Sequence, residues 1–289
     1  MEEGNLTASQ QQALEALLDD ESPGVRQGLL AQFARRGPAS VSFLQGVARR
    51  ADHDLAGHAS WFLRQLRFAD PVGEFRAFIQ SLNYELETGA LLLSRTVNAD
   101  VDVGACCAQL DALAARCRQL IAEPATIREK CRILNRVLFH EHGLRGDPAH
   151  APDPRHSFLD QVLIRRTGIP ISLSIVYLLV GERVGLQLEP VGLPGHFVVG
   201  CYDEPAPFFI DAFNGGNFLG AEQVCAQLKD HAIEASLADL APTPVREVLC
   251  RCCRNLIHQY AAAGEPGPAQ LFAEFAAEFE ATHERHTSS

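Results

Sequence analysis

The segment RRTGIPISLSIVYLL, residues 165–179, decides how the central part of this chain folds. Pro170 at a first helical position and the almost wholly apolar run after it predict a buried helix. PGHF (194–197) and FIDAFNGG (209–216) follow, each inside a stretch with clear β character. A helix, a histidine strand and an aspartate strand are the parts from which many catalytic triads are assembled. The segment therefore raises the question of where a nucleophile would lie.

His196 and Asp211 are predicted to share one face of a β-hairpin. If residues 203–206 form the turn, Val198 lies opposite Asp211, and His196 is on the same face because strand side chains alternate. A one-residue shift in register would separate the two side chains. Paired, the aspartate would orient the imidazole and stabilise its cation. The alternative is purely structural, with His196 a partly buried strand residue and Asp211 an acid that begins a turn.

Composition describes an ordinary globular chain of 289 residues, 47% hydrophobic and 21% charged. A net charge of -11 argues against nucleic acid, whose phosphates require a basic face. The N-terminus has no signal-peptide pattern, and the longest apolar stretch, 169–181, is too short to span a bilayer. Nine cysteines crowded on helical segments suit a reducing compartment. These features predict a cytoplasmic protein without nucleic-acid or membrane partners.

Three regions follow from the changes in pattern along the chain. Residues 1–125 are predicted to be a helical domain, with 70–97 and 101–121 as its last two amphipathic helices. Residues 126–225 are predicted to form a small α+β core that includes a Pro- and His-rich loop at 145–157. Residues 226–289 are predicted to be a C-terminal helical hairpin, broken by Gly and Pro.

The quoted motifs resemble a known family. The stretches 145–186, 191–200 and 209–216, in this order, resemble the SirB-type branch of the transglutaminase-like superfamily, and 245–270 is similar to a tetratricopeptide-type (TPR-like) hairpin. The resemblance implies a papain-like α+β core. In active members a cysteine at the start of the helix attacks an amide, with a histidine as base and an aspartate as its orienting partner. These two roles correspond to His196 and Asp211.

The nucleophile position of that pattern falls on Pro170, within Gly168-Ile169-Pro170. Proline has no thiol from which His196 could generate a thiolate. It also lacks the backbone N–H that helps to hold the oxyanion in active members. Losing one such donor reduces turnover by roughly 100- to 1000-fold. The resemblance thus implies the scaffold of a triad without its attacking atom.

Two serines, Ser172 and Ser174, and two cysteines, Cys201 and the upstream Cys131, are candidate substitutes for the missing nucleophile. Ser172 lies about 200° around the helix from Pro170 and is expected to face away from His196. It would instead act as a helix cap, or its hydroxyl would bond back to a helix carbonyl. Ser174 shares the face of Pro170 but lies about 6 Å deeper in apolar surroundings. Cys201 is five residues from His196 and so belongs to the opposite face of the strand.

His140, His142, His150 and His156, with Asp147 or Asp153, are the candidate ligands for a zinc ion. None of these has the i, i+4 spacing of a helical zinc site, and His140 and His142 fit better as solvated residues at the C-terminal end of a helix. Cys250 and Cys253 form a C-x-x-C without a second pair, which favours packing over zinc or redox chemistry. The sequence predicts no metal and no cofactor.

The resulting prediction is an α+β protein whose core is non-catalytic and binds a protein or peptide in a regulatory or adaptor role. Its groove would involve His196 and Asp211, and the expected binding residues are Gly168, Pro170, Gly195, Asn214 and Gly215. The alternative is an amide or ester hydrolase, or an acyl transferase, that uses Ser172 or Ser174 with His196 and Asp211. Oligomeric state does not follow from the sequence.

Overall fold

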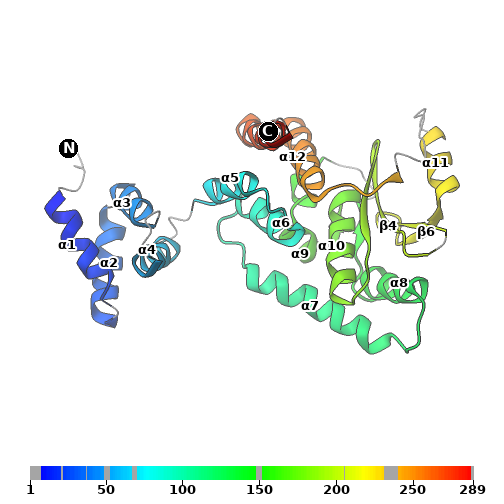
Figure 1. The fold of residues 1–289 in the computed structure, drawn as a ribbon, viewed down its shortest axis with the longest axis horizontal. Helices are drawn as coiled ribbons and strands as arrows, with labels where there is room; N and C mark the ends of the chain where they lie inside the picture. The colour runs from blue at the N-terminus through cyan, green and yellow to red at the C-terminus, as the bar shows by residue number, and fades with distance from the viewer. Residues whose placement is uncertain are drawn as a thin grey trace. The chain divides into compact units, whose positions relative to one another are not determined.

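A computed structural model describes residues 8–20, 22–36, 38–48, 53–66, 70–147, 152–204, 206–230 and 240–287. The chain divides into two compact units, Met1–Pro71 and Val72–Ser289 (Figure 1). Within the described ranges, no helix has the length and apolar character needed to cross a membrane.

The first unit consists of helices packed around their own hydrophobic core. They are α1 (Ala8–Leu18), α2 (Pro23–Arg36), α3 (Pro38–Ala48) and α4 (His53–Gln65). Two of them begin with proline, which fits the first helical position because its missing N–H would have no partner there. Phe33 and Phe62 are fully buried and meet edge to face, with ring centroids 5.5 Å apart. The predicted helical character of this region is confirmed.

The second unit combines helices with a small antiparallel sheet, as the α+β prediction requires. Its helices are α5 (Pro71–Ser81), α6 (Leu86–Arg95), α7 (Val103–Leu120), α8 (Ile127–Asn135), the π-helical turn η1 (Arg136–Glu141), the 3-10 turn η2 (Pro154–His156), α9 (Leu159–Arg165), α10 (Pro170–Arg183), α11 (Ala221–Asp230), α12 (Val245–Ala262) and α13 (Pro266–Thr287). Its strands are β1 (Arg145–Gly146), β2 (Thr167–Gly168), β3 (Glu189–Leu193), β4 (His196–Cys201), β5 (Phe208–Asp211) and β6 (Asn217–Gly220).

The sheet has the order β3-β4-β5-β6, with every neighbouring pair antiparallel. Helix α10 packs on one face of it, against Phe197, Val199 and Ile210. Figure 1 shows α10 running beside β4, with α6, α7 and α9 on its other side. Because α10 is covered on both sides, its residues from Ile171 to Gly181 are buried. The apolar run in the sequence is therefore the central helix, and it begins at Pro170 as predicted.

The single helix predicted over 70–97 is wrong, because the chain forms α5 and α6 there. Between them Leu82 adopts a left-handed backbone conformation, with φ at 59°. Glu85 then caps α6, its carboxylate accepting from the N–H groups of Glu87 and Thr88 at 2.8 and 2.6 Å. A side-chain cap of this kind starts a new helix by satisfying donors that have no partner inside it.

The compact units do not follow the predicted boundaries at residues 125 and 225. Apolar residues of α5, α6, α7, α12 and α13 join those of α10 and the sheet in one continuous core. Phe75 of α5 meets Phe275 of α13 edge to face at 4.8 Å, although the two lie 200 residues apart. Helical pattern marked these segments as helices, but long-range burial assigns them to the same unit as the sheet.

Candidate functional site

His196 and Asp211 lie together at the ends of neighbouring strands. Val199 pairs with Ile210 and Gly200 with Phe209, so the hairpin has the predicted register, in which Val198 is opposite Asp211. The Nε2 atom of His196 is 3.0 Å from Oδ2 of Asp211. The aspartate side chain is only 3% exposed, whereas that of the histidine is 23% exposed. Asp211 thus holds one ring nitrogen, and Nδ1 is the nitrogen left for other chemistry.

The turn that follows β5 donates hydrogen bonds to the carboxylate of Asp211. Asn214 donates to both carboxylate oxygens, from its backbone N–H at 3.1 Å and from its side-chain amide at 2.8 Å. Asn135 fixes the next part of this turn by donating to the carbonyl of Gly216 at 2.6 Å, and its own Oδ1 accepts from the buried hydroxyl of Tyr177. A chain of hydrogen bonds therefore connects the central helix to the aspartate loop.

These contacts determine the charge state of Asp211. Burial by itself raises the pKa of this carboxyl, but hydrogen bonds and charge attraction from His196, with hydrogen bonds from Asn214, lower the pKa below its usual 3.8. The folded protein therefore favours the carboxylate form. A carboxylate at this place stabilises the folded state above the ordinary carboxyl pKa, and the stabilisation disappears as pH falls through the lowered value.

We expect Asp211→Asn to reduce the free energy of unfolding by about 2 kcal/mol near neutral pH, because charged hydrogen bonds become neutral ones. The difference from wild type should shrink as pH falls below 3.8, where the carboxyl is protonated first in the unfolded chain, and should disappear once pH has passed the lowered pKa of the folded protein. Urea titrations followed by far-UV circular dichroism measure it. Tryptophan fluorescence is unsuitable, because the single tryptophan, Trp61, belongs to the first unit. A difference that is constant with pH would contradict the assigned ionisation.

A cavity of about 270 Å³ lies against the exposed side of His196. The start of α10 forms one wall, with Ile169, Pro170 and Ile171, and the turn between β3 and β4 forms another, with Gly195 and Phe197. Pro170 is therefore at the helix start, in the same cavity as His196, where the resemblance puts a nucleophile. None of the ten lining residues is a serine, threonine or cysteine.

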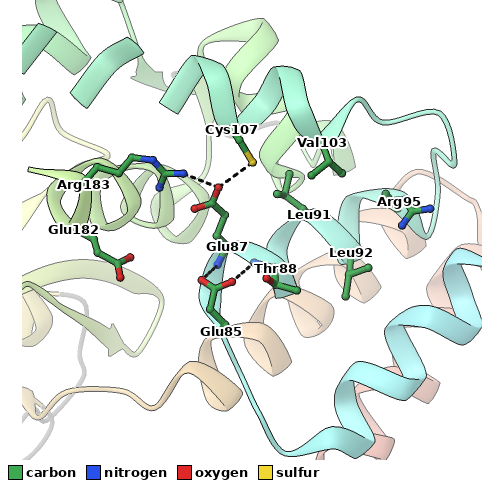
Figure 2. A pocket seen from close by; sticks show the side chains of 10 residues that line it. All are labelled: Glu85, Glu87, Thr88, Leu91, Leu92, Arg95, Val103, Cys107, Glu182 and Arg183. Atoms are coloured by element: carbon green, nitrogen blue, oxygen red, sulfur yellow. Dashed lines mark hydrogen bonds and ion pairs between the residues drawn. The ribbon is translucent and has the colours of Figure 1, made fainter. Parts of the chain in front are cut away.

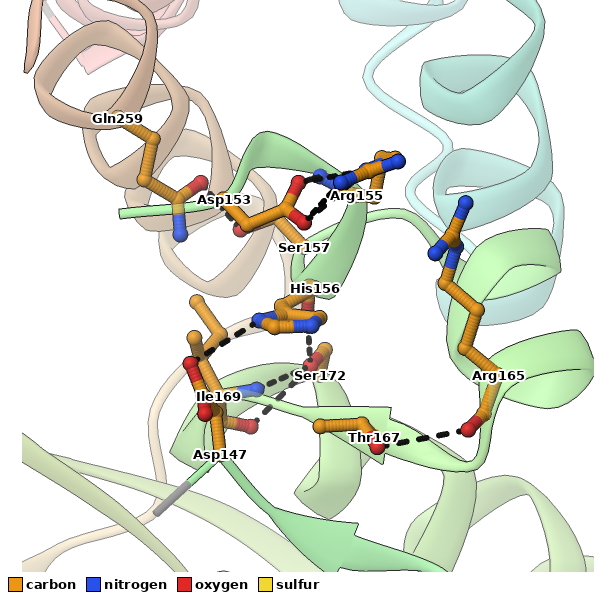
Figure 3. A network of polar contacts seen from close by, with 10 residues as sticks. All are labelled: Asp147, Asp153, Arg155, His156, Ser157, Arg165, Thr167, Ile169, Ser172 and Gln259. Atoms are coloured by element: carbon orange, nitrogen blue, oxygen red, sulfur yellow. Dashed lines mark hydrogen bonds and ion pairs between the residues drawn. The ribbon is translucent and has the colours of Figure 1, made fainter. Parts of the chain in front are cut away.

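Ser172 serves as a cap for α10 rather than as a group facing His196 (Figure 3). Its hydroxyl accepts from the N–H of Ile169 at 3.0 Å and donates to the backbone carbonyl of His156 at 2.6 Å. Ser172 is the third residue of α10, and its hydroxyl also donates to the carbonyl of Ile169 at 3.1 Å, so it combines a capping contact with a bond back to a carbonyl. Ser174 is completely buried, and its hydroxyl has no hydrogen-bond partner among the described residues. Neither serine lines the cavity.

The opposite wall of the cavity comes from α12, which the sequence reasoning did not connect with the site. Arg251, Asn255, His258 and Gln259 line it. Their spacing of i, i+4, i+7 and i+8 places them on one helical face, and this polar stripe is the signal that could have identified them. Arg251 also donates from Nη2 to the carbonyls of Leu193 and His196, at 2.6 and 2.8 Å. Helix α12 therefore holds the turn between β3 and β4 that leads into His196.

The expected binding residues have different positions. Gly195 lines the cavity beside His196, and Asn214 contacts Asp211 directly. Gly168 is buried in β2, where a side chain would lie 2.7 Å from the Ser172 hydroxyl, so its contribution is to allow the cap to form. Gly215 is exposed in the turn after Asp211 and does not line the cavity.

The cysteines and the remaining histidines contribute no nucleophile or metal centre to this cavity. Burial raises the pKa of Cys131 to about 12, and that of Cys201 above its usual value, so neither favours a thiolate. His156 lies 3.5 Å from Asp147 rather than in a larger cluster, and His150 lies outside the described residues. Throughout the described ranges, no group of three or more His, Cys, Asp or Glu side chains could hold a metal ion.

A larger cavity of about 630 Å³ lies between α6, α7 and the end of α10 (Figure 2). One of its carboxylates, that of Glu87, binds both Arg183 and Cys107. Arg183 donates to Glu87 and Asp111, both at 2.7 Å, and the thiol of Cys107 donates to Glu87. Burial, followed by this contact with Glu87, raises the pKa of Cys107. These residues serve packing between helices, and the cavity offers no histidine or activated nucleophile.

The fold and the His196–Asp211 pair correspond to a protein class. A family model described as "Transglutaminase-like superfamily" matches residues 104–254, which is more than half of the chain. The protein therefore belongs to the transglutaminase-like superfamily. The match begins in α7 and ends within α12, so it includes Arg251 of the cavity wall.

Particular relatives are bacterial and animal proteins. A UPF0162 protein of Xylella fastidiosa (strain 9a5c) is 32% identical over 197 residues, covering 66% of this chain and 70% of that protein. A UPF0162 protein of Vibrio cholerae is 28% identical, covering 57% and 60%. Human F-box only protein 21 is 33% identical over 132 residues, covering 43% of this chain and 20% of that protein. No solved structure matches the chain.

Proposed function

We propose that this protein is a non-catalytic member of the superfamily, of the SirB-type branch, that binds a protein or peptide in a regulatory or adaptor role. Its ligand groove is the cavity between α10, α12 and the His196 turn. The observation that carries the proposal is a histidine oriented by Asp211 in a cavity whose helix wall begins with Pro170. On this proposal the triad is degenerate, and His196 and Asp211 act as binding residues.

The contacts of the serines support a binding role over the hydrolase or acyl transferase alternative. Ser172 uses its hydroxyl proton for the carbonyl of His156, which removes it from the reach of a general base. Ser174 is buried within α10 and away from the cavity lining. A nucleophile needs a base within hydrogen-bond distance and an open path to the substrate, and neither serine has both.

The proposed partner and cellular compartment rest on the net charge of the chain and on its free thiols. A chain with a net charge of -11 repels the phosphates of nucleic acids, so a protein partner is favoured. Its nine cysteines are all free, which suits the reducing cytosol. The α12–α13 hairpin is proposed to be TPR-like, and helical hairpins of that kind offer extended contact surfaces.

Reactive-probe labelling tests the absence of catalysis. We expect a fluorophosphonate probe and iodoacetamide to give no labelling that depends on His196, because no hydroxyl or thiol lines the cavity. Wild type and His196→Ala are treated in parallel, and labelled peptides are identified by mass spectrometry. Stoichiometric labelling of Ser172 or Ser174 in wild type that disappears in His196→Ala would establish the enzyme alternative.

A further inference from the structure

The cavity around His196 is lined by hydrogen-bond donors and contains no acidic side chain. Its polar lining residues are His196, Arg251, Asn255, His258 and Gln259. The chain as a whole has 36 acidic residues against 25 basic ones, so a cavity without any carboxylate differs from the average surface. Asp211 does not line the cavity itself; its carboxylate lies behind His196 and binds the Nε2 atom of that residue. The lining thus favours a ligand that carries negative charge.

Gln259 directs an unpartnered donor into this space. The residue is 8% exposed, and its Oε1 accepts from the buried hydroxyl of Ser157 at 2.7 Å. That bond fixes which end of the amide faces the cavity. Nε2 donates to none of the residues that the structure describes, and Figure 3 shows it turned away from Ser157, on the side of Ile169. Ile169 lines the same cavity, so the amide nitrogen is presented to a ligand.

The start of α10 adds positive potential from the other side. Pro170 has no N–H, so the first free donors of the helix are those of Ile171 and Ser172, which have no acceptors within it. Aligned peptide dipoles give this end of the helix a partial positive charge. Gln259 on α12 and the start of α10 therefore both line the cavity, and each favours an anionic ligand.

We propose that the cavity binds a carboxylate, held by the Gln259 amide, His196 and the start of α10. The inference rests on the proposed binding function and names the chemical class of its ligand. A carboxylate needs few donors and carries one charge, which suits neutral amides and an imidazole. The apolar side chains of Ile169, Pro170 and Phe197 suit the aliphatic carbons beside it.

A phosphate is a poorer match for the same surroundings. The cavity has no lysine, and its single arginine already uses Nη2 for two backbone carbonyls. Phosphate sites at helix starts depend on several successive N–H groups, and proline removes the first of them here. A volume of about 270 Å³ accommodates one small group, such as a chain terminus or an acidic side chain.

A matched pair of small ligands tests this inference. N-Acetylglycine and N-acetylglycinamide differ only in carboxylate against amide, and the α-amide of N-acetylaspartate presents a side-chain carboxylate instead of a terminal one. Each is titrated into the labelled full-length protein while the side-chain amide signals of Gln259 and Asn255 are followed by NMR. We expect a carboxylate ligand to bind roughly tenfold or more tightly than the amide. The terminal and side-chain acids distinguish the two sources.

Gln259→Glu keeps the size of the side chain and its acceptor for Ser157, but replaces the donor by a negative charge. It should weaken carboxylate binding at least tenfold. Gln223→Glu is the matched control, because it makes the same charge change on α11, where the side chain only accepts from the N–H of Gly220. Equal binding of acid and amide, stronger binding of inorganic phosphate, or no binding of either acid would overturn the inference. Equal binding of the acid and the amide would overturn only the carboxylate inference and would leave the proposed peptide binding intact. The labelling experiment tests the absence of catalysis separately.

Discussion

Replacing Gly216 by alanine should lower the free energy of unfolding by about 3 kcal/mol or more. The residue has φ at +79°, a conformation that costs an alanine about 1–2 kcal/mol. A methyl group would also lie only 2.4 Å from the side-chain amide carbon of Asn135. Asn135 cannot move aside freely, because it binds both the Gly216 carbonyl and the Tyr177 hydroxyl. Relieving such a contact typically costs a further 1–3 kcal/mol.

The neighbouring Gly215 supplies the control for this prediction. It has φ at +70°, but nothing lies within 4 Å of the place where its methyl group would be. Gly215→Ala should therefore show only the backbone cost of about 1–2 kcal/mol. Urea unfolding followed by far-UV circular dichroism measures both variants. Equal destabilisation of the two would mean that Asn135 adapts at no cost and that the link from Tyr177 to the aspartate loop is weak.

Introducing cysteine at position 170 should create a reactive thiol in a cavity that has none. A cysteine at a helix start beside an imidazole commonly has a pKa of about 3.5–7.5 instead of about 8.5. More thiolate at neutral pH, partly offset by the lower nucleophilicity of such a thiolate, gives alkylation about tenfold faster than for an ordinary exposed thiol. Iodoacetamide rates at each cysteine of Pro170→Cys, measured by mass spectrometry, test this. Most native cysteines are buried and should react slowly.

The dependence on His196 makes the experiment specific to the site. In the double variant Pro170→Cys/His196→Ala the thiol keeps its place at the helix start but loses the imidazole. The rate at position 170 should fall toward that of an ordinary thiol. An unchanged rate would show that His196 does not act on the first residue of α10, and it would remove the argument that Pro170 occupies a former nucleophile position.

The juxtaposition of His196 and Asp211 at the centre of the site follows largely from local sequence. A turn predicted at 203–206 implies the register in which Val199 pairs with Ile210, and strand alternation then brings His196 and Asp211 to one face. Proline at a helix start similarly predicts where α10 begins. The break at Leu82 was missed, because a left-handed leucine has no sequence signal comparable to glycine.

The position of α12 in the cavity wall could not be predicted from local sequence. Gln259 is held by Ser157 across 102 residues, and Arg251 reaches the carbonyl of His196 across 55. The polar stripe on α12 is visible in the sequence, but its neighbour depends on how α12 packs against α10, β3 and η2. The hydrogen bond that the Ser172 hydroxyl donates to the carbonyl of His156, 16 residues away, likewise depends on tertiary packing.

The sequence by itself determined a buried helix that begins at Pro170 and a hairpin that pairs His196 with Asp211. Both depend on side-chain periodicity and on residues close to each other in the chain. The tertiary structure alone decided that the Ser172 hydroxyl donates to the carbonyl of His156 and that Gln259, held by Ser157, lines the histidine cavity. These roles depend on hydrogen bonds between distant segments, which form only when burial of the shared apolar core brings the helices together.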